Sequence, residues 1–182
     1  EEVFWPCPSE NRPGTARPFA QGFPQADGRA HFIPTPFRPS AEEPDGRYPL
    51  YLTTGRVLYH YLTGNHTRRL KRLIKKYPEP LLEVHPETAQ RLGLAEGGLA
   101  VVRSRRARAC YRVRYNPKIR PDTLFVPFHW EGERAINRLI NPALDPSCGM
   151  PEFKVAAVDL APFTQPETVA TAADQEVSCT TL

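Results

Sequence analysis

A dense run of polar and basic side chains follows Thr53 and is the part of the sequence best suited to bind a ligand. It reads TTGRVLYHYLTGNHTRRLKR, and a strand-like stretch leads into Gly55. A glycine lets the backbone approach a ligand closely, and main-chain N–H groups at such a turn can donate to phosphate oxygens. Arg56 and Arg68 carry planar guanidinium groups, which can each donate two hydrogen bonds to a pyrophosphate. These residues favour a phosphate-bearing ligand, and the alternative is a solvated basic face.

The histidines and cysteines do not have the spacing of a metal site. His60 and His66 lack the i, i+4 separation of helical zinc ligands, and no acidic residue lies near them. The chain has four cysteines and no CxxC pair, which argues against zinc and iron–sulfur patterns. Isolated cysteines of this kind are more typical of reduced thiols than of a disulfide framework. The histidine and cysteine spacings therefore predict no metal ligand in this chain.

Short strands are expected to position the basic run. Segments with the β-branched, aromatic or alternating pattern of strands are 48–54, 81–85, 99–104, 109–115, 124–128 and 155–160. Helical spacing of apolar residues predicts a short helix near 67–76. A second is predicted at 86–92, with proline in its first turn and Gly93 as its end. This count favours a mainly β fold, a compact barrel with short flanking helices.

Composition divides the 182 residues into three parts. Residues 1–47 are rich in proline, glycine and aromatic residues and predict an extended strap laid over a neighbouring surface. Residues 48–162 form the barrel, and residues 163–182 are expected to be a flexible tail. The net charge of +4 fits an anionic partner. No apolar run approaches the roughly 18–20 residues that span a bilayer, so no membrane span is expected.

Ordered blocks of this sequence resemble the molybdopterin-dinucleotide-binding domain of the dimethyl sulfoxide reductase family of molybdenum oxidoreductases. The first is TGRVLYHYLTGNHTRR, and the second is LLEVHPETAQRLGLAEGGLAVVRSRRA. LFVPFHW and NRLINPALDPSCGMPEFK resemble the later blocks, and the opening WPCP, PGT and DGRAHF resemble what precedes the domain. The resemblance covers roughly residues 3–160. It implies a six-stranded double-psi β-barrel.

The resemblance also implies a cofactor, molybdenum (or tungsten) bis(molybdopterin guanine dinucleotide), of which the domain holds one pterin dinucleotide. It further implies that a [4Fe-4S] cluster and the metal ligand lie in a missing N-terminal part, and that the strap 1–47 comes from this preceding catalytic region. No catalytic residue is therefore expected in this chain, and the fragment alone should be inactive. Phe128 and His129 match positions near the substrate funnel. The positions expected to bind the cofactor, by the resemblance and by their chemistry, are Thr54, Gly55, Arg56, His60, Thr63, Arg68, Asn137 and Lys154.

Two positions depart from the usual family pattern. Cys148 stands where close relatives carry lysine, and Ile140 where threonine is common. The closing loop therefore lacks one cation and one hydroxyl that close relatives carry.

Within the family, HYLTGNHTRR followed by YPEPLLEVHP is more similar to assimilatory nitrate reductase than to formate dehydrogenase. That similarity implies reduction of nitrate to nitrite in the cytoplasm. It also implies an electron donor protein, which could be ferredoxin, flavodoxin or an NADH-linked subunit. The other expected partner is the rest of the same polypeptide.

Two readings from other classes remain at this point. A stand-alone cofactor-binding module would have little use for a long aromatic strap. A nucleic-acid-binding barrel would use the basic turn 105–108 and the run 67–76, but aromatic residues do not alternate with these cations as in a stacking platform. We therefore expect no nucleic-acid partner.

Overall fold

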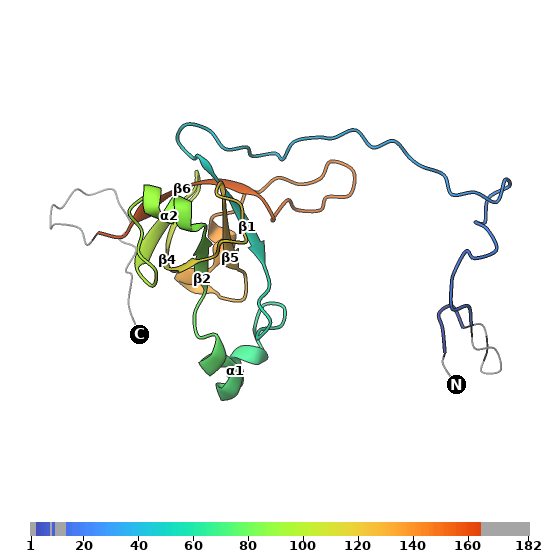
Figure 1. The fold of residues 1–182 in the computed structure, drawn as a ribbon, viewed down its shortest axis with the longest axis horizontal. Helices are drawn as coiled ribbons and strands as arrows, with labels where there is room; N and C mark the ends of the chain where they lie inside the picture. Colours follow the sequence, from blue (N-terminus) through green and yellow to red (C-terminus); the bar gives the residue numbers. More distant parts are fainter. Residues whose placement is uncertain (1–2, 8, 10–13, 165–182) are drawn as a thin grey trace. The chain divides into compact units, whose positions relative to one another are not determined.

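Six strands close into a barrel in the computed structural model, which describes residues 3–7, 9 and 14–164 (Figure 1). The order around the barrel is β1-β5-β2-β4-β3-β6, with β6 pairing back to β1. The pairs β1–β5 and β2–β4 are parallel, and the others are antiparallel. The strands are β1 (Leu50–Gly55), β2 (Leu81–Val84), β3 (Leu99–Arg103), β4 (Arg108–Tyr115), β5 (Thr123–Pro127) and β6 (Ala156–Pro162). The predicted mainly β, six-stranded barrel is confirmed.

The barrel core is built by alternation along the strands. In β1, Leu50, Leu52 and Thr54 are buried while the residues between them are half-buried, which is the period of a strand with one face inward. Leu82 of β2 and Leu124 of β5 are fully buried in the same core. Each buried side chain of this size stabilises the folded state by roughly 1.5–3 kcal/mol. Because a shift by one residue would turn these side chains outward, their burial also fixes the strand register.

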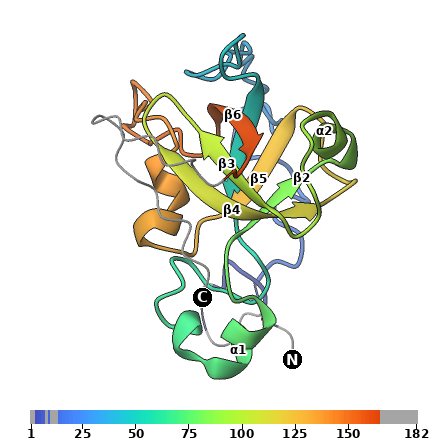
Figure 2. The same cartoon turned by 90° about the vertical axis from the view of Figure 1, so that its left-hand side faces the viewer.

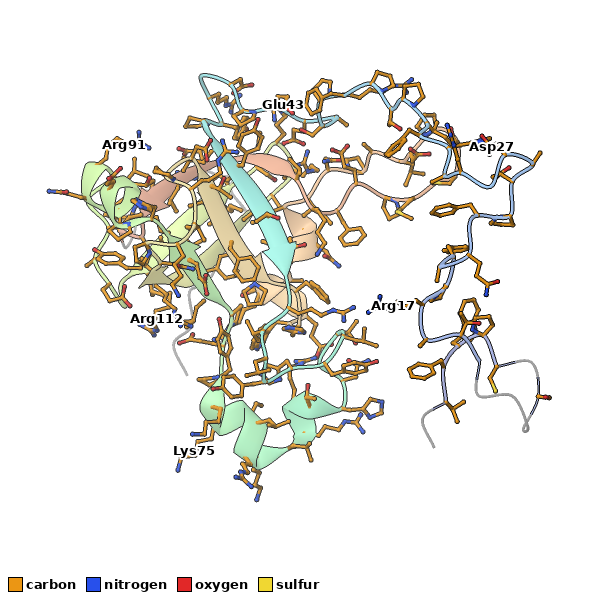
Figure 3. The ribbon with its side chains drawn as sticks, turned by 45° about the vertical axis from the view of Figure 1, so that its right-hand side comes forward. Arg17, Asp27, Glu43, Lys75, Arg91 and Arg112 are labelled. Carbon is orange, nitrogen blue, oxygen red and sulfur yellow. The ribbon has the colours of Figure 1, made fainter. Side chains whose placement is uncertain are left out.

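The flanking helices are short, and two of them lie at opposite ends of the barrel. α2 (Pro86–Arg91) begins with proline, its cap residue His85 accepts a hydrogen bond from the Glu87 N–H, and Gly93 follows with φ +67°. α1 (Lys71–Lys76) projects beyond the end at which β1 and β5 finish (Figures 1 and 2). Lys75 of α1 and Arg91 of α2 mark these two ends (Figure 3).

Several sequence expectations need adjustment. The helix expected at 67–76 is interrupted at Leu70, whose extended backbone (ψ 105°) separates the 3-10 turn η1 (Thr67–Arg69) from α1. Two further 3-10 turns, η2 (Gly132–Arg134) and η3 (Ile136–Arg138), were not expected.

Cys110 is disulfide-bonded, so the expectation of a reduced thiol is wrong for that residue. Sequence spacing could not predict this, because it does not reveal which thiols meet in the folded chain.

The chain divides into two compact units, residues 1–38 and 39–182. The described residues of the first unit contain no helix or strand, and the rings of Phe19 and Phe23 stack with centroids 5.0 Å apart. The second unit contains the barrel. The predicted tail lies outside the described residues from 165 onward. In the described part of the chain, no helix is long and apolar enough to cross a membrane.

Candidate functional site

The parallel strands β1 and β5 end side by side at Gly55 and Pro127. Just beyond, the Phe128 N–H donates to the Gly55 carbonyl at 3.1 Å. A Cβ atom on Gly55 would lie 2.6 Å from Cε2 of Phe125, closer than side-chain carbons approach in proteins. A side chain at this position would therefore force either the Phe125 ring or the end of β1 to shift, and glycine lets the β1 backbone lie close to the β5 side chains.

Lys154 is tied to this strand end. Its Nζ donates to the Thr54 carbonyl at 2.9 Å and lies 5.5 Å from the ring centroid of Phe128 and 5.2 Å from that of Phe153. The Thr54 hydroxyl is buried and donates to the Phe153 carbonyl at 3.1 Å. A carbonyl and two ring faces thus hold the ammonium group in place while its side chain stays exposed. A cation fixed in this way is suited to an anionic ligand.

The loop 56–70, between β1 and α1, brings together three more predicted residues. His60 is buried. Its ring centroid lies 5.7 Å from the ring centroid of His129 and 5.1 Å from that of Trp130. Arg68 forms an ion pair with Glu131 at 3.1 Å, a residue that follows β5. Its Nε is buried without a hydrogen-bond partner within the described residues. This guanidinium edge can still donate to a ligand.

Three further predicted residues are, like Lys154, exposed. Arg56 and Thr63 lie on the loop 56–70, and Asn137 lies on η3. None of their side chains has a hydrogen bond within the described part of the chain. The structure therefore links Thr54, Gly55, Phe128 and Lys154 in one group, and His60, Arg68 and His129 in another. Among the described residues, no hydrogen bond or ion pair joins Asn137 to either group.

His129 differs from the expectation of a funnel residue. Its side chain is 0% exposed, its Nε2 accepts from the Val57 N–H at 2.9 Å, and its Nδ1 donates to the Leu62 carbonyl. With both ring nitrogens engaged, no polar atom of the ring faces outward. The funnel role stays a prediction for Phe128, which is half-buried, and the geometry of His129 favours a structural role.

Burial lowers the pKa of His129 below its usual 6.5, and the nearby His60, Arg56 and Arg68 lower it further, against the opposing hydrogen bond to Leu62. The unfolded chain therefore takes up this proton at a higher pH than the folded chain. The contribution to stability is fully present above pH 6.5 and is lost as the pH falls through the lower folded pKa. We expect nitrogen-15 spectra to show the Nδ1–H tautomer of His129, titrating below 6.5. A midpoint above that value would contradict the neutral ring.

Sequence reasoning missed Asn141, a buried amide in the loop after η3. Its Nδ2 donates to the Val155 carbonyl at 2.7 Å and to the Glu152 carbonyl at 3.3 Å, and its Oδ1 accepts from the Ala143 N–H at 2.9 Å. This amide closes the loop that carries Lys154. Only the Asn-Pro pair at 141–142 hinted at a turn there.

The basic turn between β3 and β4 is largely neutralised. Glu42 is 9% exposed and accepts from Arg105 at 2.8 Å, from Arg106 at 2.6 Å and from the Ala157 N–H at 3.0 Å. Arg105 also pairs with Asp45. Arg106 donates to the Leu139 carbonyl at 2.7 Å, directly after η3. The guanidinium groups of Arg105 and Arg106, which a nucleic-acid-binding barrel would use for phosphate contacts, are therefore already paired within the protein.

A surface hollow lies at the other end of the barrel, where β1 and β5 begin, and includes none of the predicted site residues. Its lining residues are Pro49, Leu50, Arg91, Leu92, Pro121, Asp122, Asp159 and Leu160. Among the described residues, no cluster of three or more His, Cys, Asp or Glu side chains could hold a metal ion. The candidate site is therefore the end formed by Gly55, Phe128 and Lys154 with the loop 56–70.

Comparisons with known proteins identify similar chains. The sequence model of a family described as "Molydopterin dinucleotide binding domain" matches residues 50–157. The assimilatory nitrate reductase catalytic subunit of Bacillus subtilis is 43% identical over 163 residues, which cover 88% of this chain and 23% of that protein. The F420-dependent formate dehydrogenase subunit alpha of Methanocaldococcus jannaschii is 40% identical, covering 87% of this chain and 23% of that protein.

Two further matches extend the comparison. The periplasmic nitrate reductase of Desulfovibrio desulfuricans is 34% identical, covering 85% of this chain and 22% of that protein. Acetylene hydratase from Pelobacter acetylenicus superposes with a TM-score of 0.55 at 22% identity, over 64% of this chain and 18% of that one, which shows the fold alone. The chain spans less than a quarter of the length of these curated relatives.

Proposed function

Because the chain belongs to the molybdopterin dinucleotide-binding domain family, we propose that it is the cofactor-binding C-terminal part of a molybdenum oxidoreductase that reduces nitrate to nitrite. The observation that carries the proposal is the fixed cation at the glycine strand end: Lys154 held against Thr54 beside Gly55. The cofactor proposed is molybdenum bis(molybdopterin guanine dinucleotide). The iron–sulfur cluster and metal ligand would come from other parts of the polypeptide.

The residues at this end of the barrel fit such a group. A pterin guanine dinucleotide has an anionic pyrophosphate and two heterocycles with hydrogen-bonding edges. Lys154, Arg56 and the unpartnered Nε of Arg68 would meet the pyrophosphate. The exposed Thr63 would meet a heterocycle edge. The resemblance gives the same role to Asn137 on η3, whose amide both donates and accepts. Gly55 would let the backbone approach the ligand.

The bound metal centre supplies the transfer of an oxygen atom and two electrons, and this chain supplies binding and orientation. Lys154 would hold its ammonium group at a fixed distance from the strand end, and Phe128 would shield one side of the site from water. We propose that the strap 1–47 covers another part of the same polypeptide. We also propose a cytoplasmic location and a ferredoxin, flavodoxin or NADH-linked donor.

A second candidate function is formate oxidation in the same family. The observation that favours it is the 40% identity to the methanogen formate dehydrogenase subunit, close to the 43% identity to the nitrate reductase. The site residues would keep the same cofactor-binding roles in either case. The two functions differ in the substrate and in the direction of electron flow, because nitrate would take two electrons from the metal centre and formate would give two to it.

A viologen assay on the full-length protein that contains this chain separates the two. We expect reduced viologen to be oxidised on addition of nitrate, with nitrite as product. Oxidised viologen should not be reduced by formate. Reduction by formate without nitrate turnover would move the protein to the second function. If the protein contains molybdenum but shows neither activity, both proposed substrates are wrong.

A further inference from the structure

The loop 56–70 carries Arg56, Thr63 and Arg68, yet regular structure does little to fix its first half. Two internal backbone hydrogen bonds end in that half, from the His60 N–H to Val57 and from the Gly64 N–H to Tyr61. The other three, donated by Arg68, Arg69 and Leu70, lie in the second half around η1. Leu62 adopts φ +47°, a left-handed conformation that costs a non-glycine residue free energy. The Leu62 side chain is 43% exposed, so its own packing does little to offset that cost. Another part of the fold must hold this loop.

His129 contacts the loop from the segment after β5. Because the Val57 N–H donates to Nε2, that nitrogen carries no proton, and Nδ1–H is left to donate to the Leu62 carbonyl. The two bonds bracket the turn between residues 57 and 62. One of them falls on the strained residue itself. The carbonyl of His129 also lies beside Gly64, where a Cβ atom would be 2.7 Å from it.

His60 holds the other side of the same loop. Its Nε2 donates to the Tyr77 carbonyl at 2.8 Å, just after α1, and its Nδ1 accepts from the Thr67 hydroxyl at 3.2 Å. That hydroxyl in turn accepts from the Tyr61 N–H at 3.2 Å. The two imidazoles therefore use opposite tautomers, and each links the loop to a different neighbouring element.

We propose that His129 and His60 are positioning residues that form a loop clasp, holding residues 57–67 so that Arg56, Thr63 and Arg68 face the cofactor. This inference rests on the proposed function for the identity of the ligand. It assigns His129 a role through the loop and gives it no contact with substrate. It also explains why an uncharged, doubly hydrogen-bonded ring follows directly on the half-buried Phe128.

The test uses three variants of His129 in the full-length protein. In His129→Gln the side-chain oxygen can accept from Val57, and in His129→Asn the amide can donate to Leu62. His129→Phe keeps a planar ring and loses both bonds. Hydrogen exchange is measured at the amides of His60, Gly64 and Arg68, with buried barrel amides of β1 and β5 as the control for folding. Molybdenum and released guanine nucleotide are measured per chain.

For His129→Phe we expect the three loop amides to exchange roughly 10-fold faster while the barrel amides are unchanged, because each lost bond stabilises the loop only modestly. Cofactor occupancy should fall in the order wild type, Asn or Gln, then Phe, reflecting a roughly 10- to 100-fold loss of affinity. Molecules that retain cofactor should keep the wild-type KM for nitrate.

The clasp is overturned if His129→Phe leaves loop exchange and occupancy unchanged. A raised KM for nitrate at full occupancy would instead restore the funnel role. Hydrogen exchange needs no ligand, so it tests the clasp even if the wild-type protein contains no molybdenum. That last result would overturn the proposed function and leave the clasp standing on exchange alone.

Discussion

Replacing Gly55 by alanine is expected to reduce turnover of the full-length protein on the order of 100-fold and to destabilise the barrel by about 1–3 kcal/mol. The new methyl group would lie 2.6 Å from Cε2 and 3.2 Å from Cζ of Phe125. At this distance either the Phe125 ring or the end of β1 must shift. A shift of β1 displaces the Thr54 carbonyl that fixes Lys154. Steady-state kinetics and urea unfolding measure the two effects.

Gly46→Ala is the matched control, because a Cβ atom at Gly46 would meet nothing within 4 Å and its φ is not positive. It should leave turnover and stability close to wild type. The double variant Gly55→Ala, Phe125→Leu removes the edge of the ring and should recover part of the stability. If Gly55→Ala behaves like Gly46→Ala, the close approach at the strand end has no functional role.

Replacing Glu42 by alanine is expected to cost about 2–4 kcal/mol of unfolding free energy. A fully buried ion pair broken in this way costs roughly 3–5 kcal/mol, and the partial exposure of Arg105 and Arg106 reduces the penalty. The substitution removes the acceptor for two guanidinium groups and for the buried Ala157 N–H. The midpoint temperature of thermal unfolding, Tm, should fall by roughly 5–15 °C.

Acid should reproduce part of this loss. Burial alone raises the pKa of Glu42, but hydrogen bonds from Arg106 and Ala157 and the charges of both arginines lower it overall below 4.5. The stability it contributes is present above pH 4.5 and is lost as the pH falls through the lower folded pKa.

Glu131→Ala is the control for Glu42→Ala, because it removes an exposed ion pair with Arg68 and should cost less than about 1 kcal/mol of unfolding free energy. Equal losses for Glu42 and Glu131 would contradict the buried role of Glu42.

The barrel could be predicted from sequence because its signals are local. Alternation within 81–85, the hairpin pattern around 99–115 and the proline and glycine that bound α2 each depend on neighbouring residues. The helix at 67–76 was only partly right, since nothing in the spacing of Leu70, Leu73 and Ile74 revealed that Leu70 itself is extended.

The arrangement of the candidate site could not be predicted in the same way, because its contacts join distant positions. Lys154 meets Thr54 across 100 positions, and His129 meets Val57 across 72. Glu42 lies in a proline-rich segment more than 60 positions before the arginines it contacts, so its role as the buried partner of Arg105 and Arg106 is visible only in three dimensions. Residue type and family resemblance named His129 as a candidate, and only the three-dimensional contacts indicate that its ring faces the loop.

The most direct test of the account is to measure molybdenum and acid-released guanine nucleotide in the purified full-length protein, in its Lys154→Met variant and in a Lys75→Met control. Both lysines are exposed, but only Lys154 is held at the strand end, and Lys75 lies on α1, which projects from the barrel (Figure 3). We predict that wild type and Lys75→Met contain both molybdenum and guanine nucleotide and that Lys154→Met has lost most of both. A wild-type protein without either, or equal contents in all three proteins, would contradict cofactor binding at this end of the barrel.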